Sequence, residues 1–365
     1  MARAGRRHVT RRVTRCVAGG LGAALAIAVV ACARGDADTP MNRSGLMRLA
    51  VIGDSDSHAY HDSIAFPPGT PMRGGARRDV TFQWTETLHA MRGREVDQGP
   101  WGERGHSARG ARALGMVGIA VRTPRKRDFE YNVAYSGARC GDLTGPRGQV
   151  AQLRRAIDAD AAAWAGGVVL IRIGINDIGR REVLDEVART GMTDAHRARV
   201  RACTDAIIDA VRGLRRAHEQ LNFVLVGIAD NANWPPNFDA FRDVEALRRL
   251  DAMHDAYDDA LRAFASATPG VAFFDDRAWL RERWGSRGAD GAPAYRPYPV
   301  AGLSVALAQS DEAASAYVSD GHANTVVNAL WAQSLARFVA ERFGARITPV
   351  TDDEVTAFLR PLVAP

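Results

Sequence analysis

The chain has 365 residues, of which 46% are hydrophobic and 25% charged, a composition typical of globular proteins and not of disordered or fibrous ones. Its net charge of +6 has one source, because residues 1–31 contain six arginines and no acidic residue. Without them, 48 − 6 = 42 basic side chains face 42 acidic ones. The basic balance therefore belongs to the N-terminus, and the rest of the chain lacks the electrostatic footprint of a nucleic-acid-binding protein.

Residues 1–33 have the layout of an export signal, with a basic segment ahead of the Ala-rich stretch Val17–Ala31. That stretch is too short and too rich in glycine for a typical membrane span. The tetrapeptide VVAC resembles a bacterial lipobox, in which a lipidated Cys32 would anchor the protein to a membrane; the small residues around it also suit ordinary signal peptidase. A third interpretation is a misassigned start, with Met41 or Met47 as the true first residue. We predict an exported protein that is periplasmic, secreted or lipid-anchored.

After a polar linker over 34–46, strand-like apolar runs alternate with helical patterns. Strands alternating with helices form parallel βαβ units. We therefore predict one α/β domain over 47–345, a three-layer, doubly wound, flavodoxin-like parallel sheet of about five strands, followed by a C-terminal tail over 346–365. The expected strands lie at 46–53, 131–135, 167–173, 223–228 and 271–274, and the expected helices at about 82–92, 147–160, 195–219, 247–267 and 324–343.

Two segments, about 56–128 and 281–318, do not fit this alternation and are rich in glycine, proline and arginine. Insertions of that length at strand tips usually shape a substrate site or cover it. Cys140 and Cys203 stand alone and far apart, without the CxxC spacing of a structural zinc site. They could pair in an oxidising compartment, but we expect buried free thiols.

Polar motifs follow the expected strands. They are GDS at 53–55, N-x4-G at 132–137, GIND at 174–177 and DGH at 320–322, the last ahead of the final helix. In a doubly wound sheet such strand ends meet at one edge, where ligands bind. As an ordered set, from residue 49 to about residue 335, they resemble the SGNH hydrolases, also called the GDSL esterase/lipase family.

The resemblance implies a role for each motif. Ser55 would be the nucleophile, His322 the general base and Asp320 the carboxylate that orients it, which is the logic of a catalytic triad. The N–H groups of Ser55 and Gly137 and the side-chain amide of Asn176 would form the oxyanion hole that stabilises the tetrahedral intermediate. The resemblance implies no cofactor and no metal.

The last of the four motifs departs from the usual pattern of the family. The family usually spaces it D-x-x-H, whereas Asp320 stands two residues before His322 and Ser319 precedes it. Asp320 would then reach the imidazole by another path or not at all, leaving a backbone carbonyl to orient the ring. The leucine that the family has after GDS is replaced by Asp56.

Several features carry alternative interpretations. Ser57 is a competing nucleophile. Asp56 and His58 have the D-x-H form of metallophosphoesterases, and together with Asp54 and His61 they could hold a metal. Arg139 and Arg172 lie beside the motifs and could meet an anionic substrate group. The segment after the fourth strand, beginning at Trp234, could form a pocket wall or a rigid turn.

We therefore expect a serine esterase that cleaves O-acetyl or short-chain acyl esters through an acyl-enzyme. The polar insertions favour a small acyl group on a polar carrier, a small molecule or a carbohydrate. The alternatives are a catalytically impaired binding protein of the cell envelope or a metal-dependent phosphoesterase. The sequence leaves the oligomeric state open.

Overall fold

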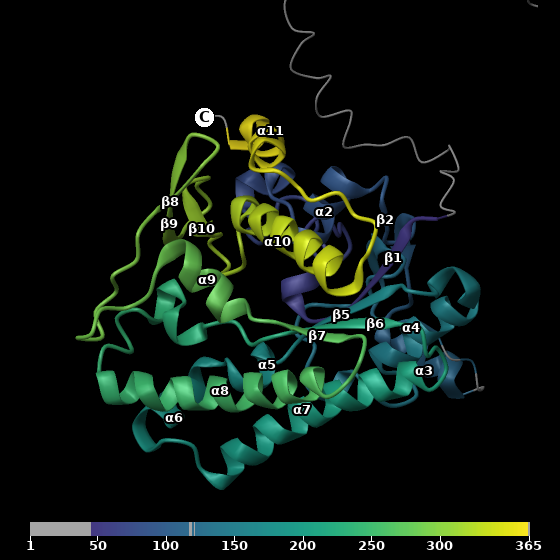
Figure 1. Ribbon diagram of the computed structural model, residues 1–365, viewed down its shortest axis with the longest axis horizontal. Helices are drawn as coiled ribbons and strands as arrows, with labels where there is room; N and C mark the ends of the chain where they lie inside the picture. The colour runs from purple at the N-terminus through teal and green to yellow at the C-terminus, as the bar shows by residue number, and fades with distance from the viewer. Residues whose placement is uncertain (1–44, 117–118, 120, 364–365) are drawn as a thin grey trace, which may run out of the picture. The chain divides into compact units, whose positions relative to one another are not determined.

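The computed structural model describes residues 45–116, 119 and 121–363 (Figure 1). The predicted export signal, with Cys32, and most of the predicted linker lie outside these residues. The described part confirms the predicted α/β fold, because five strands form one parallel central sheet with helices on both faces. In spatial order they are β2 (Val96–Asp97), β1 (Met47–Gly53), β5 (Val168–Arg172), β6 (Asn222–Val226) and β7 (Val271–Phe274).

The sheet buries both of its faces, as the near-continuous apolar runs of its strands predict. On β1, Ala50 and Ile52 join one buried cluster while Leu49 and Val51 join the other, following the two-residue period of a strand. The first face is covered by α4 (Gln149–Asp158), α7 (Asp194–Arg215) and α8 (Val244–Ser266), and the second by α2 (Trp84–Arg92), α9 (Asp276–Trp284) and α10 (Thr325–Phe343).

The strand expected at 131–135 is not one of the five, and that prediction was wrong. This segment makes a single isolated bridge to β1, between Asn132 and Val51, while β2 pairs with the start of β1 on the same edge. The segment still follows the end of β1, because the N–H of Val133 donates to the carbonyl of Val51 at 2.9 Å and the N–H of Tyr135 donates to that of Gly53 at 3.3 Å. The chain then turns away at the end of β1, and the loop that follows stays beside that strand end.

The remaining elements lie in the insertions and connections. The segment 346–365, set apart as a tail, contains α11 (Asp352–Val363), which buries Val355 and Leu359 in the same cluster as α10. The others are α3 (Ala108–Met116), α5 (Ile175–Ile178), α6 (Arg181–Thr190), the antiparallel pair β3 (Trp101–Arg104) and β4 (Lys126–Phe129), the three-stranded sheet β8 (Tyr298–Val300), β9 (Leu303–Gln309) and β10 (Ser315–Tyr317), and the 3-10 turns η1 (Ser55–Ser57), η2 (Gly75–Val80), η3 (Cys140–Asp142), η4 (Ala161–Trp164), η5 (Asn231–Asn233) and η6 (Pro235–Asn237).

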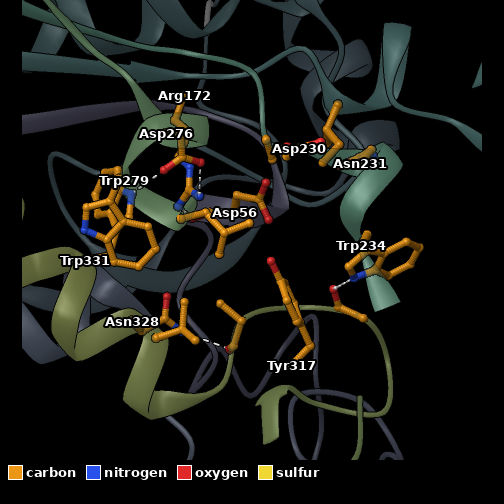
Figure 2. A pocket seen from close by; sticks show the side chains of 16 residues that line it. Asp56, Arg172, Asp230, Asn231, Trp234, Asp276, Trp279, Tyr317, Asn328 and Trp331 are labelled. Atoms are coloured by element: carbon orange, nitrogen blue, oxygen red, sulfur yellow. Dashed lines mark hydrogen bonds and ion pairs between the residues drawn. The ribbon is translucent and has the colours of Figure 1, made fainter. Parts of the chain in front are cut away.

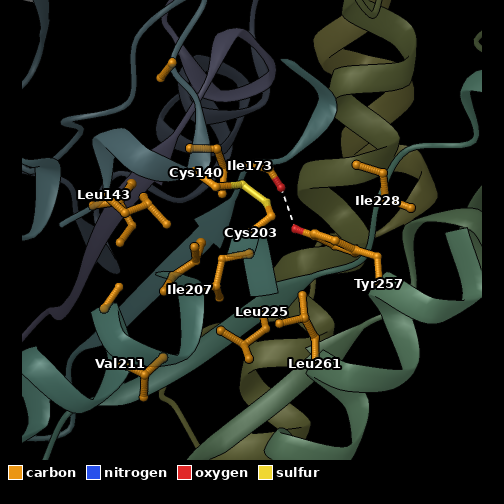
Figure 3. Close-up of a cluster of buried hydrophobic side chains, with 14 of the residues drawn as sticks. Cys140, Leu143, Ile173, Cys203, Ile207, Val211, Leu225, Ile228, Tyr257 and Leu261 are labelled. Atoms are coloured by element: carbon orange, nitrogen blue, oxygen red, sulfur yellow. Dashed lines mark hydrogen bonds between the residues drawn. A yellow bond between two sulfur atoms is a disulfide. The ribbon is translucent and has the colours of Figure 1, made fainter. Parts of the chain in front are cut away.

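Cys140 and Cys203 are joined in a disulfide, so the expectation of free thiols was wrong (Figure 3). Their Cα atoms lie 5.0 Å apart, although 63 residues separate them in sequence. The bond fastens the start of η3 to the middle of α7, inside the apolar cluster beneath the sheet. Sequence separation could not reveal this contact, because it depends on where the loop after 131–135 crosses α7.

Within the described residues, no helix combines the length and the apolar character needed to cross a bilayer.

Candidate active site

Ser55 is the first residue of η1, directly after β1, and only 8% of it is exposed. Its turn is fixed by Asp54, whose Oδ1 accepts the backbone N–H of Asp56 at 3.0 Å. Gly53 has no room for a side chain, because a Cβ would lie 2.2 Å from the carbonyl oxygen of Arg172. The glycine thus lets β1 and β5 approach closely where the serine emerges.

The strand end before the serine is held by a reciprocal pair of bonds from α4. The N–H of Gly53 donates to Oε1 of Gln149 at 2.7 Å, and Nε2 of Gln149 donates to the carbonyl of Gly53 at 2.8 Å. Burial, followed by the charge of Asp56, raises the pKa of Asp54 well above its ordinary value. These contacts make Gly53 and Asp54 supports for the turn that presents Ser55.

Gly137 lies in the loop that follows the 131–135 segment. Its φ of 83° is in the left-handed region, which glycine adopts without steric cost. The N–H of Tyr135 donates to the carbonyl of Gly53 at 3.3 Å, and the N–H of Ala138 donates to the carbonyl of Tyr135 at 3.2 Å. The Gly137 loop is therefore a tight turn against the end of β1, next to Ser55.

Asn176 is the second residue of α5, which follows β5. Its Nδ2 donates to the carbonyl of Ala138 at 3.0 Å, while Oδ2 of Asp177 accepts the N–H of Cys140 at 2.9 Å. These two bonds tie α5 to the Gly137 loop. An amide nitrogen carries two hydrogens, so Asn176 keeps one donor for a further acceptor such as an oxyanion.

His322 and Asp320 lie together in the turn before α10, despite the shortened spacing. Nδ1 of His322 is 3.0 Å from Oδ1 of Asp320, and the same oxygen accepts the backbone N–H of His322 at 3.3 Å. Burial works to raise the pKa of Asp320, but the bond to His322 and the charge of Arg73 outweigh it, so that this pKa lies well below its ordinary value. The carboxylate is thus ionised and lies beside the imidazole.

Arg73, from the first insertion, completes this arrangement. Its side chain is fully buried, with the guanidinium 4.4 Å from the ring centroid of Phe66. Nη1 and the backbone N–H of Arg73 donate to Oδ2 of Asp320 at 2.7 and 2.9 Å, and Nη1 also lies 2.5 Å from Nδ1 of His322. Nη2 donates to Oγ of Ser136 at 3.1 Å. One side chain thereby connects the histidine turn to the residue that precedes Gly137.

The Ser55 hydroxyl and the His322 imidazole are not hydrogen-bonded to each other in the part of the chain that the structure describes. The two turns are joined indirectly, because Oη of Tyr60, five residues after Ser55, donates to the carbonyl of Ala323 at 2.9 Å. Catalytic hydrogen bonds are often long without substrate and tighten when it binds.

Ser57 and the histidines of the possible metal site have other partners. Ser57 is fully buried and accepts a bond from Nε1 of Trp84 at 3.2 Å. Nε2 of His58 lies 2.9 Å from Asp62, and Nδ1 of His61 lies 2.9 Å from Glu86. The two rings therefore bind different carboxylates instead of converging with Asp54 and Asp56. Among the described residues, the only group with metal-ligand spacing is Cys140, Asp177 and Cys203, whose sulfurs are joined in the disulfide.

A pocket opens beside the motifs (Figure 2). Asp56, Ile175 and Gly321, each next in sequence to a candidate site residue, line it, and the hydroxyl of Tyr317 points toward its middle. Trp234 forms part of its wall and donates from Nε1 to the carbonyl of Gly321 at 3.1 Å. The rest of the lining is Arg172, Ala229, Asp230, Asn231, Asp276, Trp279, Leu280, Ala323, Val327, Asn328 and Trp331.

Arg73, Ser136 and Tyr317 are not singled out by any sequence pattern. Arg73 lies about 250 residues from the aspartate it contacts, and its only local signal is the Gly74-Gly75 pair, whose positive φ angles shape the turn. Of the two arginines noted from sequence, Arg172 donates to Asp276 at 3.0 Å, so its charge is already paired with a carboxylate of the protein.

The sequence profile of the GDSL-like Lipase/Acylhydrolase family matches residues 52–297. The chain belongs to this family, and it is an ester-bond hydrolase. A search of curated proteins found no match.

Several solved structures are similar at low identity. A family 3 carbohydrate esterase of Clostridium thermocellum is 13% identical, with a TM-score of 0.39, covering 83% of this chain and 100% of that one. A family 2 carbohydrate esterase of Corynascus thermopiles (Myceliophthora fergusii), with a carbohydrate-binding domain, is 17% identical, with a TM-score of 0.41, covering 84% and 69%. An extracellular lipase of Streptomyces rimosus is 16% identical, with a TM-score of 0.32, covering 68% and 86%.

Proposed function

We propose that the protein is a serine esterase that hydrolyses short acyl esters through an acyl-enzyme intermediate. Ser55 attacks the ester carbonyl, and His322 takes the serine proton and passes it to the leaving alcohol. Asp320 orients the imidazole, and the N–H groups of Ser55 and Gly137 with the amide of Asn176 stabilise the oxyanion. Water then attacks the acyl-enzyme, with His322 as base, and releases the acid. The observation that carries the proposal is the 3.0 Å contact between Asp320 and His322.

The pocket in Figure 2 supports a polar alcohol as the carrier of the acyl group. It offers the carboxylates of Asp56 and Asp230, the hydroxyl of Tyr317 and the indole of Trp279. Carboxylates and hydroxyls suit the hydroxyl groups of a polyol or sugar, and an indole provides a flat apolar face. A carbohydrate O-acyl ester combines both features, so we infer that substrate class.

Export from the cytoplasm is supported by two independent features. Residues 1–33 have the layout of an export signal, and Cys140 and Cys203 form a disulfide, which persists in oxidising compartments. A lipidated Cys32 would keep the enzyme at the membrane surface. Radiolabelled fatty acid incorporated by the wild type and lost in Cys32→Ala would support the anchor, and its absence from both would leave a secreted protein.

The test of the proposed function is hydrolysis of p-nitrophenyl acetate and butyrate by the full chain, Ser55→Ala and Ser57→Ala. Ser57 is a matched control, because it lies two residues away in the same turn and binds Trp84. We expect turnover by the wild type and Ser57→Ala, unaffected by EDTA, and a loss of at least about 1000-fold in Ser55→Ala. Labelling of Ser55 by a fluorophosphonate, found by mass spectrometry, would identify the nucleophile directly.

Two outcomes would contradict the proposal. Equal activity in Ser55→Ala and the wild type would exclude Ser55 as the nucleophile. Activity removed by EDTA and restored by a divalent cation would favour a metal-dependent hydrolase instead, and p-nitrophenyl phosphate would then test the phosphoesterase alternative. Hydrolysis of an acetylated sugar, compared with that of p-nitrophenyl acetate, would then test whether the alcohol part of the ester is a carbohydrate. We expect a higher kcat/KM for the sugar ester.

A further inference from the structure

A second depression is lined by Asn176 and shares no lining residue with the pocket of Figure 2. Its lining contains three arginines from three different segments: Arg139 after the Gly137 loop, Arg180 ahead of α6 and Arg199 in α7. We call this depression the arginine pocket; its remaining lining is Asn176, Asp177, Glu182 and Val183. Because Asn176 belongs to the candidate oxyanion hole, the arginine pocket adjoins the reaction centre.

The three arginines are not used within the protein to neutralise carboxylates. Among residues 45–116, 119 and 121–363, none of the three forms an ion pair, and Arg199 makes only a long 3.5 Å contact to the carbonyl of Asp177. The carboxylate of Asp177 is engaged by the N–H of Cys140 at 2.9 Å. Three permanently charged guanidinium groups thus face one depression that also holds a single unpaired acid, Glu182.

The neighbouring arginines behave differently. Arg181, next to Arg180, pairs with Asp185 at 2.7 Å, and Arg197, two residues before Arg199, pairs with Asp194 at 2.7 Å. Arg189 on α6 and Arg201 on α7 also form no ion pair among the described residues, and they lie outside the arginine pocket. Lack of pairing alone therefore does not distinguish the pocket; its three arginines are distinguished by lining one depression together with Asn176.

The pocket is also braced. Cys203 follows Arg199 by four residues, one helical turn, and its disulfide to Cys140 holds the neighbour of Arg139 against α7. The amide of Asn176 is bonded to the carbonyl of Ala138 at 3.0 Å. The backbones that carry Arg139 and Arg199 are therefore fixed relative to Asn176, while the three arginine side chains are exposed and accessible to a ligand from solvent.

Resting on the proposed function, we infer that the arginine pocket binds an anionic group, a carboxylate or a phosphate, on the ester substrate. A guanidinium presents a planar fork of donors that matches such oxyanions. The substrate class then narrows to acyl esters in which the acyl or the alcohol part carries a negative charge close to the ester. Glu182 limits the affinity by repulsion, so Glu182→Gln should strengthen binding of the anion.

Two matched pairs of esters test this inference and locate the charge. p-Nitrophenyl monosuccinate and p-nitrophenyl butyrate have acyl chains of equal length and differ in one carboxylate; 3-acetoxybenzoate and phenyl acetate place that difference on the alcohol. Arg139→Gln, Arg180→Gln and Arg199→Gln should each raise KM for the preferred anionic ester roughly tenfold, with little change for its neutral partner. Arg181→Gln and Arg197→Gln are the controls and should change neither.

Binding is measured separately from turnover, by calorimetry of the same esters with Ser55→Ala and of succinate and inorganic phosphate with the wild type. Binding of the free anions that weakens in the three pocket variants and at higher salt would support the inference, and the stronger competitor would identify the anion. Such anion binding would support the inference even if no ester were hydrolysed. In that case only the proposed esterase activity would be contradicted. Equal KM changes for charged and neutral esters, or anion binding indifferent to all three substitutions, would overturn it.

Discussion

Arg73 donates two hydrogen bonds to Oδ2 of Asp320, from Nη1 at 2.7 Å and from its backbone N–H at 2.9 Å. The other oxygen of that carboxylate lies 3.0 Å from Nδ1 of His322. A D-x-H turn has one residue fewer than D-x-x-H to bring the carboxylate to the ring. Here Arg73, from the first insertion, holds the carboxylate of Asp320 beside the imidazole of His322. The contacts of the insertion therefore compensate for the shortened turn.

We therefore predict that Arg73 is a positioning residue. Arg73→Met should lower kcat on p-nitrophenyl acetate by roughly 10- to 100-fold with little change in KM, and Arg73→Lys should recover part of the loss. The control is Arg78→Met, since Arg78 is also buried and, within the described part of the chain, its side chain donates to the carbonyl of Tyr60 in the same insertion and to no carboxylate. Equal losses in Arg73→Lys and Arg73→Met, or a loss in Arg78→Met of the same size, would reduce the role of Arg73 to packing.

Replacing the two glycines of the site by alanine should have different effects, one on activity and the other on stability. In Gly137→Ala the new methyl group meets nothing within 4 Å, but φ of 83° strains an alanine by roughly 1–2 kcal/mol. We expect a folded protein whose kcat falls because the loop relaxes away from the oxyanion. In Gly53→Ala the methyl group would lie 2.2 Å from the carbonyl of Arg172, so the unfolding midpoint itself should fall. Denaturant titration beside kcat separates the two, and a normal kcat in Gly137→Ala would argue against that N–H in the oxyanion hole.

Much of the fold follows from patterns in the sequence. The buried strands over 167–173 and 223–228 are long apolar runs, and the motifs at 53–55 and 174–177 follow strands whose ends must meet in a parallel sheet. The edge strand could not be predicted, because Val96–Asp97 is two residues long, while the 131–135 segment has the composition of a strand but forms a single bridge. Propensity describes a residue's preference, whereas edge pairing depends on neighbours distant in sequence.

The candidate site divides in the same way. Its motif residues, such as Ser55 and His322, each belong to a short motif that can be recognised in the sequence. The structure brings these motifs to one edge of the sheet. Arg73, by contrast, acts on Asp320 from about 250 residues away, and the arginine pocket draws on three segments. Such contacts arise from tertiary packing alone, so a single sequence does not specify them.

The disulfide predicts coupling between stability and activity. It closes a 63-residue separation, and its loss should lower the free energy of unfolding by about 2–4 kcal/mol. Because Cys140 lies three residues after Gly137 and its N–H binds Asp177, kcat should fall as well. Cys140→Ala, Cys203→Ala and the double variant should lose equal stability, since each removes the same bond. Additive losses, or wild-type stability after reduction with dithiothreitol, would contradict this account.

The burial of His254 predicts that the folded protein loses stability as the pH falls. It is fully buried on α8, and neither ring nitrogen has a hydrogen-bond partner among the described residues. Burial, only partly opposed by the charge of Asp230, lowers the pKa of His254 to about 4. The unfolded chain therefore takes up a proton at this residue below about pH 6.5, and the native state does so only near pH 4. Stability is lost as pH falls through that window, by about 2–3 kcal/mol from this group.

Replacing the imidazole should remove that contribution. We expect the unfolding free energy of His254→Leu to fall less between pH 7 and pH 4 than that of the wild type, by about 2–3 kcal/mol, because leucine has no proton to gain. The exposed His106 provides the control, and His106→Leu should retain the wild-type slope. Urea titrations at half-unit steps of pH measure all three proteins. Parallel pH profiles for His254→Leu and the wild type would show that this histidine is protonated in the native state, and would place the acid sensitivity in the paired carboxylates instead.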